Sequence, residues 1–268
     1  MNPYYIFNHT KRQRVSNGII QPLLENRETA SHILILVWPQ LGDFDSLEYA
    51  WWLKPEAKKL ADEKLAIRAV GIGNLSSGKR FCEYTGFPQA NLFVDPNAEL
   101  HGQLNLYSGL NLSLPGLSGS HKAWLNLLLM CVGIGSPRTL GEVFRGYSGY
   151  RGDRQAPQLI GDDEMIEDTP LPAFKGSFFH LAGGSGFQRP FELATLRLRN
   201  MVEVLINWQT YVPNSADLTQ RGATFLFNSQ RELVYEHRDL GILGFTANMS
   251  QPLSFLYLWK TNSCMSTK

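Results

Sequence analysis

The stretch HILILVW, residues 32–38, decides the fold class of this chain of 268 residues. Its apolarity is continuous rather than alternating, which is typical of a strand that is covered on both faces of a sheet. A second buried run, LAIRAVGIG at residues 65–73, follows after a helical stretch. Strand, helix and strand in this order predict a βαβ unit, in which the two strands are parallel neighbours and the crossover is right-handed.

The residues between these two strands predict a long helix. Pro39 and Gly42 give a turn signal after the first strand. The sequence DSLE at residues 45–48 fits a variant capping box, which makes Asp45 the expected N-cap. Pro55 lies inside the predicted helix, and we expect it to kink the helix or to split it in two.

Further strands and helices are predicted outside this unit. Gly86 closes a short helix, and Asp95-Pro96 is expected to open another one with proline in its first turn. In addition to the helix at 76–85, the sequence predicts strands at 91–94, 223–227 and 232–237, of which the last two form a hairpin. Residues 1–30 are interpreted as a leading segment with short strands.

The middle of the chain departs from this alternation. It holds three predicted helices, at residues 121–132, 139–147 and 188–208. The third has one apolar face, made by Phe191, Ala194, Leu198, Met201, Val202, Leu205 and Trp208. These helices, together with Trp51-Trp52 and Trp124, either pack into the core or cover a partner, and the sequence leaves both interpretations open.

Composition and charge restrict the classes of function. The chain has 25 basic and 24 acidic residues, so its net charge of +1 gives no reason to expect a nucleic-acid partner. Its longest apolar run, residues 124–134, is too short for a membrane span, and no secretory signal is expected at the start. Cys82, Cys131 and Cys264 are odd in number and widely spaced, which favours a reducing, cytoplasmic compartment over a disulfide framework or a zinc site.

Two segments carry a resemblance to a known family. The sequence FCEYTGFP at residues 81–88, followed by LFVDP at residues 92–96, is similar to the peroxiredoxin-like branch of the AhpC/TSA antioxidant family. QRG at residues 220–222, before the strand ATFLF, resembles the closing hairpin of that branch. The resemblance implies a thioredoxin-like, peroxiredoxin-type α/β fold, with a central mixed sheet and flanking helices.

The same resemblance implies how the chain is organised. It covers about residues 31–110 and 219–240, which would form the core of a single thioredoxin-like domain over residues 1–268. Residues 1–30 would precede this core, and residues 241–268 would form a tail. Residues 111–218 have no counterpart in the compact members, and they are interpreted as a helical insertion.

The family's redox motif, Gly-Cys-x-x-Cys, matches GDFDS at residues 42–46, where Asp43 and Ser46 replace both cysteines. The older spacing Pro-x3-Thr-x2-Cys gives Pro39, Asp43 and Ser46. Peroxide reduction needs a thiolate that becomes a sulfenic acid, and a serine hydroxyl has no such chemistry. The resemblance therefore implies a site that has lost peroxide reduction.

Arg221 lies where the family carries an arginine that polarises the thiolate and the peroxide, and here we expect it to pair with a carboxylate of the loop. Asp43, Asp45, Ser46 and Glu48 are open to two interpretations. They either cap the helix or form a repurposed acid/base or metal site. The capping interpretation is favoured because no histidine lies near them in the sequence.

Two functions remain open. The first is a non-catalytic interaction or regulatory protein with an unidentified protein partner and with no cofactor or metal. The alternative is a thiol-dependent peroxidase or oxidoreductase that uses a relocated cysteine such as Cys82, which lies beside Lys79 and Arg80. Cys131 is expected in the core, Cys264 in an exposed polar tail, and the glycine-rich residues 183–186 in a connector. The resemblance also implies a photosynthetic organism, with the cyanobacterial cytosol or the plastid stroma as the compartment.

Overall fold

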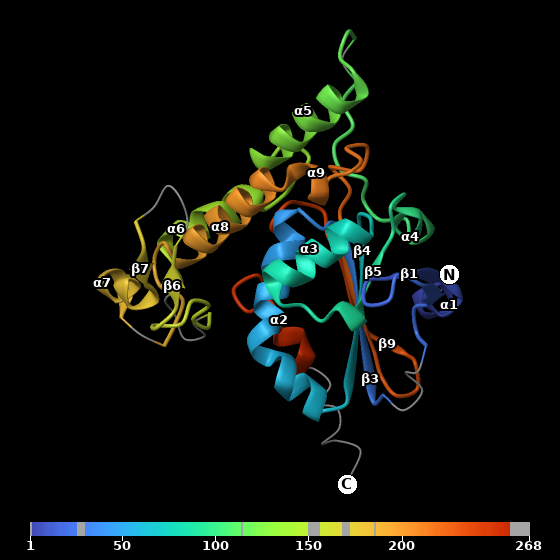
Figure 1. Cartoon of the computed structure of the whole chain (residues 1–268), viewed down its shortest axis with the longest axis horizontal. Helices are drawn as coiled ribbons and strands as arrows, with labels where there is room; N and C mark the ends of the chain where they lie inside the picture. The colour runs from blue at the N-terminus through green and yellow to red at the C-terminus, as the bar shows by residue number, and fades with distance from the viewer. Residues whose placement is uncertain are drawn as a thin grey trace.

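A seven-stranded mixed sheet forms the centre of the computed structural model (Figure 1). The structure describes residues 2–25, 30–113, 115–149, 156–167, 172–184 and 186–257. The strands lie side by side in the order β2 (Ile20–Pro22), β1 (Lys11–Arg14), β5 (Leu92–Val94), β4 (Leu65–Ile72), β3 (His32–Gln40), β8 (Ala223–Phe227) and β9 (Leu233–Arg238).

The predicted βαβ unit is confirmed. β3 and β4 are parallel neighbours in which Ile33 pairs with Ala66 and Val37 with Val70. β5 continues the parallel part beside β4, whereas β8 runs antiparallel to β3, and β9 antiparallel to β8. All five strands that the sequence predicts therefore belong to one sheet.

The sheet is covered on both faces, as the continuous apolarity of β3 predicts. Leu34, Leu36 and Trp38 pack into one core cluster, and Ile33, Ile35 and Val37 pack into another. Figure 1 shows α2 (Phe44–Asp62) and α3 (Leu75–Thr85) on the first side, with α1 (Pro3–His9) and α4 (Glu99–Gln103) on the second. Successive side chains of a strand point to opposite faces, so one apolar run supplies both clusters.

The leading segment contributes more than the sequence predicts. β1 pairs with both β2 and β5 and so extends the sheet at one edge. Helix α1, which the sequence analysis did not predict, begins after the Asn2 cap and places Phe7 against Phe225 and Phe227 of β8, at ring distances of 5.1 and 6.1 Å. A seven-residue helix is marginal by itself, so packing rather than propensity decides its formation.

The structure answers two expectations about helices. α2 runs unbroken through the exposed Pro55, so this proline does not split the helix in two. The helix after β5 begins at Glu99 rather than at Asp95-Pro96, because Asp95 forms a turn and its carboxylate accepts from the backbone N–H of Leu100 at 2.8 Å. The prediction that Gly86 closes the preceding helix is confirmed, since this residue caps α3 in the left-handed conformation.

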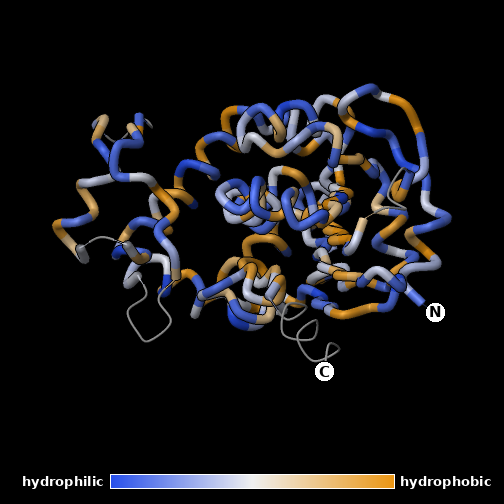
Figure 2. The backbone as a smooth tube through the Cα atoms, turned by 90° about the horizontal axis from the view of Figure 1, so that it is seen from below, coloured by the Kyte–Doolittle hydropathy of each residue, from blue (hydrophilic) through white to orange (hydrophobic). Residues whose placement is uncertain are grey.

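Residues 111–218 form helices beside the sheet. The three predicted helices are present as α5 (Gly119–Cys131), α6 (Thr139–Ser148) and α8 (Glu192–Ile206), and a short α9 (Trp208–Tyr211) follows. Two-residue strands β6 (Met165–Ile166) and β7 (Phe174–Lys175) pair with each other, and α7 (His180–Gly183) comes after them. Figures 1 and 2 both show β6, β7 and α7 projecting away from the sheet. Ser185 of the glycine-rich connector lies outside the described residues.

The chain after β9 packs back onto the sheet. Phe245 stacks on Tyr49 of α2 at a ring distance of 4.5 Å, and Phe255 stacks on Tyr235 of β9 at 4.3 Å. Cys264 lies outside the described residues. Among the helices that the structure describes, none combines the length and the apolarity that crossing a bilayer requires.

Candidate functional site at the start of helix α2

The loop between β3 and α2 brings the predicted site residues together. Asp43, rather than Asp45, is the N-cap of α2, and its Oδ1 accepts from the backbone N–H of Asp45 at 3.0 Å. Asp45 cannot serve as the cap because its carboxylate has other partners. Its Oδ1 accepts from the backbone N–H of Leu243 at 2.6 Å, and its Oδ2 faces Arg221.

Arg221 lies at the centre of this site and is fully buried. Its Nη2 is 2.7 Å from Asp43 Oδ2, and its Nη1 is 3.3 Å from Asp45 Oδ2. Its remaining N–H groups donate to the backbone carbonyls of Thr219 and Leu218. The expectation that Arg221 pairs with a loop carboxylate is therefore confirmed, and both carboxylates share the guanidinium. An arginine held in this way has its donors already directed at protein oxygens.

Ser46 and Pro39 lie at the same loop between β3 and α2. Ser46 lies in the first turn of α2, is fully buried and donates its hydroxyl to the carbonyl of Gln40 at 2.8 Å. It accepts no backbone N–H of the helix, so its expected role as a cap is wrong. Pro39 is buried where the register of β3 against β4 is interrupted, which suits a residue without a backbone N–H.

The carboxylates are crowded. Burial raises the pKa of Asp45 well above its usual range, and the charge of Asp43 raises it further, while Arg221 opposes both effects. Asp239, which follows β9 and is also buried, approaches the same arginine, and burial raises its pKa to about 8. One guanidinium faces three acidic groups, so the site favours keeping a proton on the carboxyls over accepting another anion.

The two described cysteines lie in different surroundings. Cys82 packs in the main core cluster, and burial raises the pKa of its thiol to about 12. Cys131 of α5 is only half-buried and packs against the small core cluster of Met130, Ile242 and Leu243, so its expected place in the core is confirmed only in part. It borders the loop beside Asp43 and Phe44, and burial, followed by the charge of Asp43, raises its pKa to about 11.

A second buried ion pair, which the sequence analysis missed, joins α8 to α2. Nε and Nη2 of Arg197 contact both oxygens of Glu48 at 2.7 and 3.1 Å. The Nη1 group of the same arginine donates to the carbonyl of Glu142 in α6 at 2.7 Å. This bidentate contact fixes α8 against the start of α2. The sequence holds one signal of it, an arginine flanked by apolar residues in a helix.

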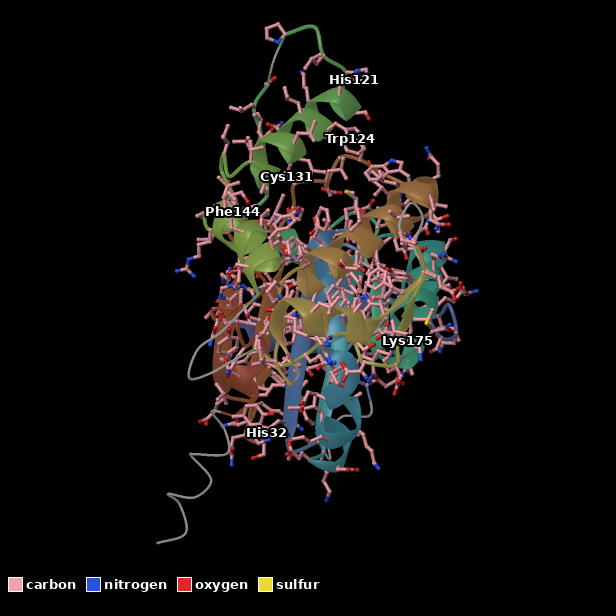
Figure 3. The ribbon with its side chains drawn as sticks, turned by 90° about the vertical axis from the view of Figure 1, so that its left-hand side faces the viewer. His32, His121, Trp124, Cys131, Phe144 and Lys175 are labelled. Atoms are coloured by element: carbon pink, nitrogen blue, oxygen red, sulfur yellow. The ribbon has the colours of Figure 1, made fainter. Side chains whose placement is uncertain are left out.

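α9 and α5 close over the loop. A Cβ added at Gly42 would lie 2.8 Å from Tyr211 Cβ, so the loop and α9 are in direct contact. Trp124 of α5 stacks on Trp208 of α9 at a ring distance of 4.6 Å. Figure 3 shows Trp124 and Cys131 along α5 and Phe144 on the neighbouring α6. Between α5, α8 and α9 and the loop lies a cavity of about 230 Å³.

Comparison with known proteins bears on the family. A family model described as AhpC/TSA antioxidant enzyme matches residues 52–241, which is more than two thirds of the chain. The match includes Arg221 and the segment 111–218, whereas Asp43 and Ser46 precede it. Neither the curated proteins nor the solved structures gave a match. The thioredoxin-like α/β class is supported by this match and by the mixed sheet with its flanking helices.

The first prediction concerns the buried arginine. Arg221→Met should lower the free energy of unfolding by about 3–5 kcal/mol, because it leaves Asp43 and Asp45 buried without their partner. Arg80→Met is the control. It removes a partly exposed pair with Glu203 and should cost at most about 1 kcal/mol. Urea denaturation measures both values, and equal losses would contradict the central role of Arg221.

The second prediction concerns pH. Because the pKa of Asp239 is about 8 in the folded protein and near 4 in an unfolded chain, the folded state holds a proton that the unfolded state releases in between. This contribution to stability is lost as pH rises through that window. Asp239→Asn removes the effect, so its stability relative to the wild type should rise from pH 5 to pH 7 (about one unit inside each limit).

Thermal denaturation of wild type and Asp239→Asn at both pH values tests this sign. Asp62→Asn, at an exposed position of α2, serves as the matched control. A difference between Asp239→Asn and wild type that stays constant with pH would show that the Asp239 carboxyl does not titrate in this window.

Proposed function

The chain belongs to the AhpC/TSA antioxidant enzyme family, and we propose that it is a member that does not reduce peroxides and acts by binding a protein partner. The observation that carries this proposal is the salt bridge of Arg221 with Asp43 and Asp45. In the family, the matching arginine is the group that polarises the thiolate and the peroxide. Here the carboxylates of Asp43 and Asp45 neutralise the charge of Arg221 and accept hydrogen bonds from its guanidinium.

The state of Ser46 supports the same conclusion. Its hydroxyl is buried and engaged with the carbonyl of Gln40, so it is neither exposed to a substrate nor chemically able to form a sulfenic acid. A peroxidatic group has to be an exposed thiolate. Neither condition is met at this position.

The alternative, a relocated thiol, has less support. Burial opposes ionisation of Cys82, the cysteine that the sequence favours for this role. Cys131 is the better placed of the two described cysteines because it borders the loop. Burial and the neighbouring Asp43 nevertheless keep its thiol protonated near neutral pH.

The helices of residues 111–218 offer a surface for a partner. None of the apolar residues that the sequence places on one face of the 188–208 helix is fully buried, and Phe191, Met201 and Leu205 are exposed. The buried face of α8 instead carries Leu193, Leu196, Arg197, Asn200 and Val204. The apolar stripe of α8 is thus directed away from the centre of the core, and Phe191, Met201 and Leu205 are the members of it that stay exposed among the described residues.

α5 and α6 continue this apolar surface. We define the three-helix face as the exposed residues Leu128, Val132, Leu140, Phe144, Tyr147, Met201 and Leu205. The three helices meet at a hollow that Cys131, Tyr147 and Met201 line together. Large apolar side chains that gather in the open are typical of interaction surfaces. Such a surface supports an interaction role.

The place of action belongs to the same proposal. Cys82 and Cys131 are free thiols, which suits a reducing compartment. The cyanobacterial cytosol or the plastid stroma, as implied by the resemblance, is the compartment we propose.

The third prediction tests the loss of chemistry. The purified wild-type protein should show no thiol-dependent turnover of hydrogen peroxide above the protein-free background. Cys82→Ser and Cys131→Ser should leave that result unchanged, since neither thiol is ionised at neutral pH. A coupled assay with a dithiol reductant measures the turnover. Activity of the wild type that disappears in either serine variant would promote the oxidoreductase alternative and identify its thiol.

The fourth prediction tests the interaction surface. A partner that the wild-type protein retains from an extract of its source cells should be lost by the double variant Phe144→Asp/Leu205→Asp, because the two carboxylates would be buried in the contact. Leu181→Asp, on the highly exposed α7 outside the three-helix face, should retain it. Quantitative mass spectrometry compares the three baits, and equal retention by all of them would contradict binding through this face.

A further inference from the structure

The cavity between the β3–α2 loop and the helices of residues 111–218 has the properties of a ligand site, which goes beyond the proposed function. Its volume is about 230 Å³. Most of its wall is apolar, with Leu47 of α2 on one side and, on the other, Trp124, Leu127, Leu128, Met201, Val204, Leu205 and Trp208. Gln40, Asp43 and Asn200 are the polar residues of the wall. Apolar walls with a few polar groups are typical of small-molecule sites.

Two polar atoms of this wall lack a partner among the described residues. Gln40 is buried, and its Nε2 donates to the carbonyl of Asn214, whereas its Oε1 has no donor there. Asn200 is also buried, and its Oδ1 accepts from Trp51 Nε1 and from the hydroxyl of Tyr84. Its Nδ2 has no acceptor in the same part of the chain. Because Oδ1 already accepts from two donors, the orientation of the Asn200 amide is fixed.

An acceptor and a donor that are both buried and unsatisfied are rare in native proteins, and each needs an explanation. We propose that this cavity binds a neutral, mainly apolar ring compound that carries a primary amide or a hydroxyl group. Such a group can donate to Gln40 Oε1 or accept from Asn200 Nδ2. Its ring occupies the space between the two stacked tryptophans and the leucines of the wall.

The size of the cavity sets the size of the ring compound. An apolar cavity of about 150 Å³ is enough to bind benzene. The volume of about 230 Å³ therefore accommodates one six-membered ring together with a short polar substituent. Leu128 and Leu205 are each 57% exposed and lie at the rim, so the ligand can enter between α5 and α8.

The charges near the cavity exclude an anion. Asp43 is part of the wall, and Asp45, Asp239 and Glu48 contribute to the same buried cluster. The two arginines of this cluster, Arg221 and Arg197, already pair with Asp43, Asp45 and Glu48. A carboxylate ligand would add a further negative charge without a free cation to pair with it among these groups.

Isothermal titration calorimetry with phenylacetamide tests this site, and phenylacetate is the matched anionic probe. A compound of about ten non-hydrogen atoms in a fitting site is expected to bind with a Kd of about 1 mM or lower. Phenylacetate should bind at least about tenfold more weakly, because its charge is not compensated. Equal affinity for both probes, or no saturable binding of phenylacetamide, would overturn the inference and leave a cavity that holds water alone.

Variants of the wall locate the binding. Leu205→Trp fills the cavity from its rim and should weaken phenylacetamide binding by more than about tenfold, as expected when a ligand loses its space. Leu140→Trp is the matched control, because Leu140 belongs to the three-helix face but not to this wall, and it should bind as the wild type does. Gln40→Met removes the acceptor and should weaken binding about two- to tenfold.

Circular dichroism and a melting curve confirm that each variant is folded. Unchanged affinity in Leu205→Trp, or a loss in Leu140→Trp of the same size, would place the binding elsewhere and overturn the assignment. The comparison of the two probes on the wild-type protein needs no variant, so it decides the matter even where a substitution fails to fold.

Discussion

The buried guanidinium of Arg221 is the interaction on which the rest of the site depends. It joins the end of the loop before β8 to the first turn of α2, through Asp43 and Asp45. Asp45 in turn accepts from the backbone of Leu243 and so connects this pair with the chain after β9. Taking charges out of water is costly, and their mutual contacts have to compensate for it. An arginine fixed in this manner stabilises a fold, whereas catalysis of peroxide reduction requires one that is free to meet the substrate.

The segment 111–218 adds a second buried pair, Arg197 with Glu48, at the same helix start. This pair sets how α8 lies on α2, and with it the direction of the apolar stripe of α8. The buried side of α8 carries Arg197 and Asn200 beside Leu193, Leu196 and Val204, whereas Met201 and Leu205 remain exposed next to apolar residues of α5 and α6. In this arrangement α5 and α9 lie over the loop between β3 and α2, and the residues of the three-helix face stay exposed. The cavity lies between the β3–α2 loop and the helices α5, α8 and α9.

The sequence predicted the sheet because the signal of a buried strand, a continuous apolar run, lies within a few consecutive residues. HILILVW is recognisable without knowledge of its neighbours, and so are Gly86 as a helix end and the three helices of the middle segment. The site was predicted in part. Arg221 pairs as expected, whereas the cap moved from Asp45 to Asp43, because Asp45 finds partners 176 and 198 residues away. Arg197 with Glu48, separated by 149 residues, and the half-buried state of Cys131 depend on how α8 and α5 settle on the core. No local pattern contains that information. The assignment of residues 1–268 to a single domain with an insertion stays a prediction.

The rate at which a thiol at position 46 reacts with hydrogen peroxide tests the account most directly. Ser46→Cys is measured alone and in combination with Asp43→Asn and Asp45→Asn, which keep the cap oxygen and the acceptor for Leu243 but release Arg221. A thiolate fraction changes about tenfold for each unit of thiol pKa. The account predicts a slow reaction for Ser46→Cys alone and a reaction at least about tenfold faster in the triple variant. Fast reaction of Ser46→Cys alone, with no gain from removing the two carboxylates, would contradict it.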